Sequence, residues 1–84
     1  MKHTYIPVGV CSRQIDIELD DNAKIINVKF HGGCAGNTQG ISSLVVGMSA
    51  EEAIDRLKGI DCRGRGTSCP DQLATALEEA LEEF

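Results

Sequence analysis

The sequence contains few of the residues with which proteins bind nucleic acids. It has no Trp, 1 Tyr and 2 Phe, so side chains on which bases stack are nearly absent. There are 8 Lys and Arg against 13 Asp and Glu, and the formal net charge of −5 argues against binding to a phosphate backbone. The longest apolar run, Leu44-Val45-Val46, is too short for a membrane span or for the core of a signal peptide. We therefore expect a soluble, cytoplasmic protein with neither a nucleic-acid nor a membrane partner.

The length and composition indicate a single small domain spanning residues 1–84. Hydrophobic residues make up 42% of the chain and charged residues 25%, which is typical of globular rather than disordered proteins. No internal repeat, low-complexity tract or linker divides the sequence. A domain of this size buries only about 60% of the surface that its unfolded chain exposes, and it has no room for a large multistep enzyme.

Alternation of apolar and polar side chains predicts three strands in the first third of the chain. The second and third strands flank the turn residues Asp20-Asp21-Asn22 and form an antiparallel hairpin. Pro7 places the first strand at an edge of the sheet. The residues expected to share a face are, strand by strand, Thr4, Ile6 and Val8, then Ile15, Ile17 and Leu19, and finally Ile26, Val28 and Phe30.

Helical spacing of apolar residues predicts three helices in the rest of the chain. Their expected starts are the capping residues Asn37-Thr38, the capping pair Ser49 and Glu52, and Cys69-Pro70, and the first two helices are expected to end at Gly47 and Gly59. The expected apolar residues of the first helix are Ile41, Leu44, Val45 and Met48. Together these elements predict an α+β fold, in which a three-stranded antiparallel sheet is followed by three helices packed on one face, in the order βββααα.

Four cysteines, Cys11, Cys34, Cys62 and Cys69, are the most unusual feature of so short a chain. Each lies in a predicted loop or at the end of a predicted element, whereas a buried thiol used as a small apolar group lies more often within an apolar stripe. Cys11 precedes the predicted hairpin and Cys34 follows it, so the two are expected to be neighbours. Cys69 lies at a helix N-terminus, where the helix dipole stabilises a thiolate, and Cys62 lies on the glycine-rich loop that leads there.

The expected convergence of four thiolates favours a metal site, with Cys11, Cys34, Cys62 and Cys69 as the ligands of one zinc ion or of an iron–sulfur cluster. Four thiolates suit tetrahedral zinc and a cluster equally well, so the residues leave the metal open. A thiol redox protein, with Cys69 as the nucleophile and Cys62 as the resolving thiol, is the main alternative. A disulfide framework suits a secreted chain rather than a reducing compartment, and an interaction module with incidental thiols is the simplest alternative.

No set of catalytic residues stands out, so the sequence leaves open whether the protein is an enzyme. His31 lies three residues before Cys34 and is expected to be an exposed bystander on the polar strand face. The segment from Arg63 to Ser68 precedes a helix N-terminus, as anion-binding loops do. Because it lacks the phosphate-binding pattern, we expect it to be a plain loop.

The segment Thr67-Ser68-Cys69-Pro70-Asp71 spells the motif that gives the TSCPD domain family its name. Further segments, among them Gly9-Val10-Cys11-Ser12 and His31–Asn37, also resemble the small stand-alone members of this family. TSCPD domains occur at the C-terminal end of adenosylcobalamin-dependent ribonucleotide reductases, and the family is regarded as a cysteine-based metal binder. The resemblance implies an accessory module for deoxyribonucleotide synthesis, with a ribonucleotide reductase or another redox protein as its partner.

The chain also resembles the iron–sulfur cluster scaffold proteins of the IscU/NifU type. Cys11, Cys34 and Cys69 match the three cysteines that hold the cluster in these scaffolds, and the segment Gly47–Ala53 matches the start of their middle helix. This resemblance implies a scaffold-like fold and an alternative function in cluster assembly. Cys62 has no counterpart among the three and completes an all-cysteine set, which favours retention of a cluster over its transfer.

Overall fold

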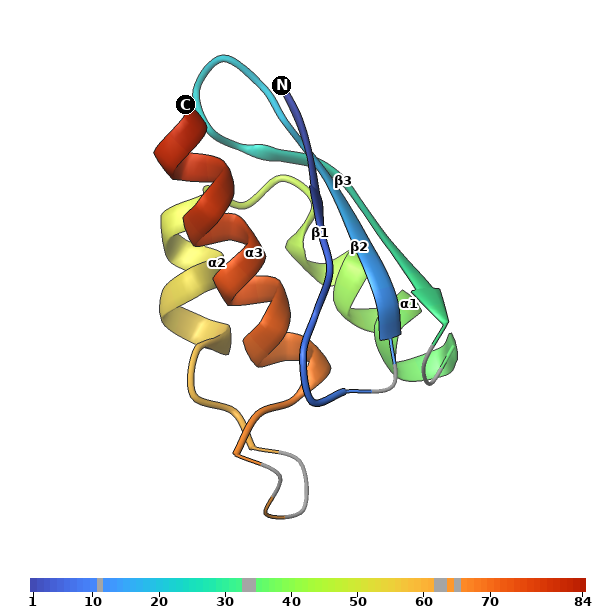
Figure 1. Ribbon diagram of the computed structural model, residues 1–84. Helices are drawn as coiled ribbons and strands as arrows, with labels where there is room; N and C mark the ends of the chain where they lie inside the picture. The colour runs from blue at the N-terminus through green and yellow to red at the C-terminus, as the bar shows by residue number, and fades with distance from the viewer. Residues whose placement is uncertain (11, 33–34, 62–63, 65) are drawn as a thin grey trace.

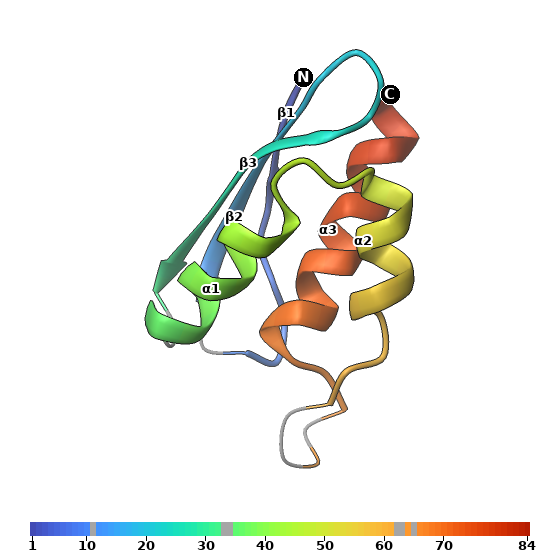
Figure 2. The same ribbon diagram turned by 180° about the vertical axis from the view of Figure 1, so that it is seen from behind.

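A computed structural model describes residues 1–10, 12–32, 35–61, 64 and 66–84. It contains a three-stranded antiparallel sheet followed by three helices, which confirms the predicted α+β fold and the order βββααα. The helices cover one face of the sheet and leave the other open (Figures 1 and 2). None of the helices in the described ranges is long and apolar enough to cross a membrane.

The six elements follow one another along the chain, and the connection between the last two helices, residues 58–68, is the longest. The strands are β1 (Lys2–Tyr5), β2 (Ser12–Leu19) and β3 (Ile25–Gly32), and the helices are α1 (Ala35–Val45), α2 (Ala50–Leu57) and α3 (Cys69–Glu83). The sheet has the strand order β1-β2-β3, so β2 is central and pairs antiparallel with both neighbours.

The hydrophobic core lies between the sheet and the helices. Ile15, Ile17 and Leu19 of β2 are buried, as their alternation predicts. Leu73 and Leu77 of α3 are fully buried in the same cluster. The N-terminal cap of α2 is also as predicted, because the Ser49 hydroxyl accepts a hydrogen bond from the Glu52 amide at 3.1 Å. These features depend on periodicity or capping between nearby residues, so they could be predicted from the sequence.

The prediction for the first strand was wrong in its extent and in its inward face. β1 ends at Tyr5, before Pro7, and both Ile6 and Val8 are exposed. Tyr5 pairs with Ile15 in β2, and residues opposite each other in a ladder point to the same face. The register therefore turns Tyr5 toward the core and Thr4 away from it.

The third strand differs from its prediction at one residue. Leu19 pairs with Ile25 while Glu18 pairs with Asn27, so Ile26 is an extra residue that opposes no partner in β2. Ile25 is 1% exposed and Ile26 is 47% exposed, the reverse of the prediction. A bulge of this kind shifts the alternation by one residue and leaves no mark in the apolar pattern.

Helix α1 also begins earlier than predicted. Its first residue is Ala35, and Thr38 is a buried residue of the helix rather than its cap. Leu44 is 76% exposed, although helical spacing placed it on the apolar side. The helix ends at Val45 and packs mainly against β3, so its buried side is narrower than the sequence stripe suggests. Gly47 has a φ of 93°, a conformation that glycine adopts without strain, and it ends the helix as predicted.

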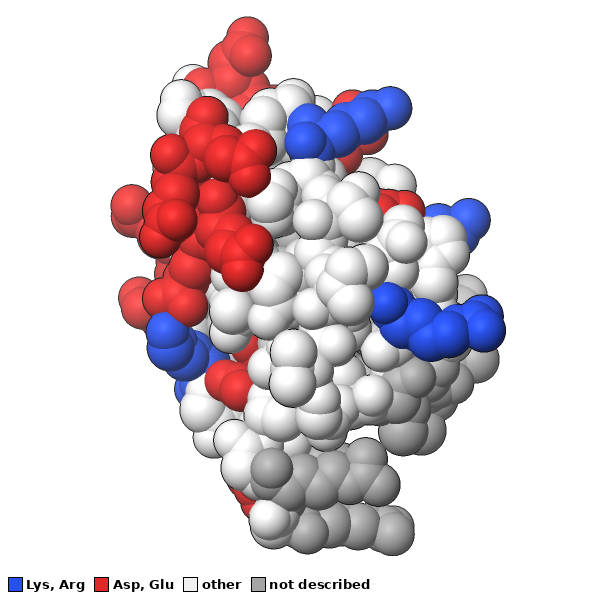
Figure 3. Space-filling model, viewed as in Figure 1, with Lys and Arg blue, Asp and Glu red and all other residues white. Residues whose placement is uncertain are grey.

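The C-terminal half of α3 carries an acidic surface (Figure 3). Its members are Glu78, Glu79, Glu82 and Glu83. Lys58 Nζ lies 2.6 Å from a carboxylate oxygen of Glu78, and His3 Nδ1 lies 2.8 Å from one of Glu83. The contact between His3 and Glu83 joins β1 to the last turn of α3, His3 Nε2 also lies 3.6 Å from a carboxylate oxygen of Glu79, and Glu82 is exposed.

Candidate functional site

The start of α3, the start of β2 and the end of β3 meet at one end of the molecule (Figure 1). The Cys69 sulfur lies 3.2 Å from the hydroxyl oxygen of Ser12, which is buried. Ser12 in turn pairs with Gly32, the last residue of β3. The contact between Cys69 and Ser12 spans 57 positions of the sequence, so the tertiary fold alone produces it.

Of the four predicted thiolate ligands, the structure describes Cys69, whose thiol is free. Cys11, Cys34 and Cys62 lie outside the described residues. Within the described ranges, no group of three or more His, Cys, Asp or Glu side chains is placed to hold a metal ion. One described neighbour of these cysteines reaches Cys69, because Ser12 follows Cys11 in the sequence and its hydroxyl contacts the Cys69 sulfur.

Ser68 is the N-terminal cap of α3, the helix expected to start around Cys69-Pro70. Its hydroxyl accepts a hydrogen bond from the Asp71 amide at 3.1 Å and donates one to the carbonyl of Ile60 at 2.6 Å. Pro70 occupies the first turn, where a missing amide hydrogen costs nothing. The cap therefore starts the helix and holds the beginning of the preceding loop against it.

Asp71 joins the same loop to the helix through its two carboxylate oxygens. One oxygen accepts from the Thr67 hydroxyl and the other from the Gly59 amide, both at 2.6 Å. These hydrogen bonds, that of Thr67 foremost, hold the pKa of Asp71 below its usual value, helped by the nearby charge of Lys58. The carboxylate is thus kept ionised and acceptor-only, as its two donors require.

Gln72 is a structural residue of this site that the sequence reading missed. It is 8% exposed, and its carbonyl oxygen accepts from the Tyr5 hydroxyl and from the Val8 amide, both at 2.9 Å. Its amide nitrogen donates to the Thr67 hydroxyl at 3.0 Å. Burial, with the charges of Glu79 and Asp71, raises the pKa of Tyr5, so its hydroxyl remains a donor. The sequence did contain a signal for this role. Gln72 lies four positions before Ala76 and therefore on the apolar face of the predicted helix, where a polar side chain needs a buried partner.

The loop that precedes residue 11 lies directly against the motif. Gly9 has a φ of 76°, and a Cβ at this position would lie 3.1 Å from the Thr67 methyl group. Together with the bond from Val8 to Gln72, this close approach fixes the course of the loop on α3. Gln72 and Gly9 therefore bring the segment before Cys11 to the helix that begins with Cys69.

We expect Gln72→Ala to lower the free energy of unfolding by about 1–3 kcal/mol, because it leaves the Tyr5 hydroxyl and the Val8 amide without their acceptor. Urea titration followed by circular dichroism measures this change. Gln39→Ala, which truncates an exposed glutamine of α1, is the matched control and should shift stability by less than about 0.5 kcal/mol. Equal stabilities of the two variants would contradict the assignment.

Four residues of the TSCPD segment have positions at the junction between loop and helix, and the side chain of the fifth, Cys69, faces β2. Thr67, Ser68 and Asp71 each make hydrogen bonds that close the loop, and Pro70 starts the helix. Cys69 has a thiol beside the Ser12 hydroxyl, at a helix N-terminus. A sulfur in this place is suited to bind a metal as a thiolate or to attack an electrophile.

The second described histidine, His31, lies on the open face of the sheet and belongs to a different cluster. Its Nε2 lies 2.8 Å from Asp16, whose carboxylate also accepts from Gln14 at 2.8 Å and from Thr4 at 3.1 Å. His31 is on the polar strand face, as predicted, but it has a partner there. The hydrogen bonds from His31, then Gln14 and Thr4, hold the pKa of Asp16 below its usual value.

The lowered pKa of Asp16 predicts how Asp16→Asn will respond to pH. Because the folded pKa lies below the unfolded value of about 3.9, the carboxylate stabilises the protein above pH ~4 and loses this effect as the pH falls through the folded pKa. More than a third of the side chain is exposed, so we expect the variant to lose at most about 1 kcal/mol at pH 7. Urea titrations at pH 7 and near pH 3 should show the difference shrinking in acid; a pH-independent difference would contradict this prediction.

Comparison with known proteins adds one positive finding. A family model described as the TSCPD domain matches residues 1–81 of the 84-residue chain. No curated protein matches the chain, and no solved structure matches it. The resemblance to iron–sulfur scaffold proteins is therefore not confirmed.

Proposed function

Because the chain belongs to the TSCPD domain family, we propose that it is a small metal-binding module whose ligands are the thiolates of Cys11, Cys34, Cys62 and Cys69. The distance of 3.2 Å between the Cys69 sulfur and the Ser12 hydroxyl carries this proposal. Ser12 follows Cys11 in the sequence, and its contact with Cys69 supports Cys11 as a second ligand. Zinc and an iron–sulfur cluster are both compatible with a set of four thiolates.

Two features of the described residues suit a thiolate at Cys69. The first turn of α3 has amide groups without intrahelical partners, and its dipole stabilises negative charge. The Ser12 hydroxyl lies within hydrogen-bond distance of the sulfur, and a hydrogen bond from this hydroxyl would orient a thiolate ligand. A bound metal would join the β-hairpin to α3 and neutralise the thiolate charge.

The loop that contains Cys62 has both its ends at α3. Ser68 binds the carbonyl of Ile60, and Asp71 binds the amide of Gly59, so the loop leaves and returns at the helix N-terminus. This closure supports Cys62 as a ligand beside Cys69.

The occurrence of TSCPD domains at the C-terminal end of adenosylcobalamin-dependent ribonucleotide reductases supports an accessory role in deoxyribonucleotide synthesis. In this role the partner is a ribonucleotide reductase or another redox protein. Titration of a purified adenosylcobalamin-dependent reductase with the metal-loaded chain, followed by calorimetry, tests for the complex. Absence of binding, and of any effect on reductase turnover, would remove this part of the proposal.

The metal proposal is tested by purifying the chain without added metal and measuring zinc, iron and sulfide per chain. We expect stoichiometric zinc, or iron with sulfide, and loss of the metal in Cys69→Ser. Ser49→Ala is the matched control, because it removes the N-terminal cap of α2 at a cost of about 0.5–2 kcal/mol but keeps all four thiols and the start of α3, and it should retain the metal.

Two outcomes of this experiment would overturn the metal proposal. A folded protein that holds none of these elements and takes up no added cobalt(II) has no thiolate metal site. A reversible disulfide between Cys62 and Cys69 in such a protein would instead indicate the thiol redox function.

A further inference from the structure

The outer edge of β3 has backbone groups that no strand in the described part of the chain uses. β3 is the last strand of the order β1-β2-β3. At its first residue this edge is covered, because the Ile25 amide donates to Met48 and the Ile25 carbonyl accepts from Gly47, both at 2.8 Å. Beyond Ile25 the described residues form no such cover.

The printed hydrogen bonds show which residues of β3 direct their backbone outward. Met1 and Leu19 exchange two hydrogen bonds, of 2.9 and 2.8 Å, so the backbone of Leu19 faces β1. In an antiparallel ladder the direction alternates, and Ile17 and Ile15 therefore also face β1. Their partners in β3 are Val28 and Phe30, whose amide and carbonyl groups must then point away from β2.

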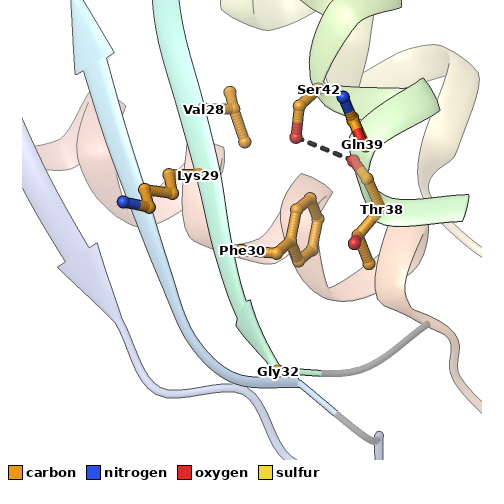
Figure 4. A pocket seen from close by; sticks show the side chains of 7 residues that line it. All are labelled: Val28, Lys29, Phe30, Gly32, Thr38, Gln39 and Ser42. Atoms are coloured by element: carbon orange, nitrogen blue, oxygen red, sulfur yellow. Dashed lines mark hydrogen bonds between the residues drawn. The ribbon is translucent and has the colours of Figure 1, made fainter. Parts of the chain in front are cut away.

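A groove of about 340 Å³ runs beside this part of the edge (Figure 4). The residues that line it are Val28, Lys29, Phe30 and Gly32 from β3 and Thr38, Gln39 and Ser42 from α1. The ring of Phe30 faces Thr38 across the groove, whereas Lys29 points to the opposite side of the strand. The free backbone groups and the groove together favour one kind of occupant, an extended strand whose inward side chains are apolar.

The charge at this edge adds a requirement for the occupant. Lys29 makes no ion pair with a carboxylate of the described residues. Its neighbour across the ladder, Asp16, is bound by His31. A residue that lies opposite Lys29 on an added strand is flanked by the two residues whose side chains enter the groove. An acidic side chain is favoured at that position, since opposite charges on directly paired residues stabilise a sheet.

From these observations we infer that the edge of β3 binds an extended peptide of a partner protein with the pattern apolar–acidic–apolar, as a fourth strand of the sheet. The same pairing with a second copy is disfavoured. If two β3 strands paired antiparallel, with Val28 of each copy opposite Phe30 of the other, the two Lys29 side chains would lie directly opposite each other. Like charges in this arrangement destabilise a sheet. This inference does not depend on the cysteines or on a bound metal.

The probe is a blocked heptapeptide, Ser-Thr-Val-Glu-Val-Thr-Ser, added to the full 84-residue chain. NMR amide shifts and hydrogen exchange give the site and the affinity. We expect the amides of Val28 and Phe30 to become protected, and we expect binding to be lost when both valines of the probe are N-methylated. Exchange of the probe's Glu for Lys should weaken binding about 2- to 10-fold.

Charge reversal on the protein gives the matched test. Lys29→Glu should reverse the preference between the Glu and Lys probes, whereas Lys2→Glu, on the opposite edge strand, should not. Three results would overturn the inference: no shifts at millimolar probe, equal binding of the N-methylated probe, or protection of Val28 and Phe30 that rises with protein concentration alone.

Discussion

Removal of the proposed metal is expected to lower the free energy of unfolding by about 4 kcal/mol, if the free metal before removal stands at about a thousand times its Kd. The proposed ligands come from four separate segments of the sequence, and a metal that binds them only in the folded state stabilises that state by mass action. For a domain of this size the loss corresponds to a fall in Tm of roughly 15–30 °C. Calorimetric scans with and without a chelator measure it.

The control for this experiment is Cys69→Ser, which keeps the fold's apolar core but lacks one ligand. Its Tm should be the same with and without chelator, and near that of the stripped native protein. If the native protein melts at the same temperature in both conditions, no metal supports the fold.

The second large effect is expected in the core. Leu77→Ala should lower the free energy of unfolding by about 2–5 kcal/mol, because Leu77 is fully buried between α3 and the sheet and its truncation leaves a cavity. A domain of 84 residues has only about 5–10 kcal/mol of stability, so the variant approaches unfolding at room temperature. Urea titration monitored by circular dichroism measures the shift in the midpoint.

Leu44→Ala is the same substitution on α1 and serves as the control, since Leu44 is 76% exposed. It should change the free energy of unfolding by less than about 0.5 kcal/mol. A loss of stability at Leu44 as large as that at Leu77 would show that the side chain of Leu44 is covered in solution.

The fold could be predicted to the level of its elements and their order. Ile15, Ile17 and Leu19 alternate without interruption, and the stripe of α3 continues from Leu73 to Ala80, so periodicity located both elements. The prediction failed where the pairing of one strand with its neighbour decides which side chains face the core. The bulge at Ile26 and the inward face of β1 depend on the register with β2, which no local pattern contains.

The candidate site also combines features that could be predicted from local sequence with features that depend on tertiary contacts. The sequence by itself determined that a helix begins around Cys69-Pro70, because local capping residues and a Pro in the first turn set the start of a helix. Only the tertiary structure decided that the Cys69 thiol meets Ser12, and that Gln72 receives Tyr5, across 57 and 67 positions of the chain. Such contacts arise when the helices pack on the sheet to bury their apolar faces, and the polar side chains at the joint then find the partners that packing brings to them.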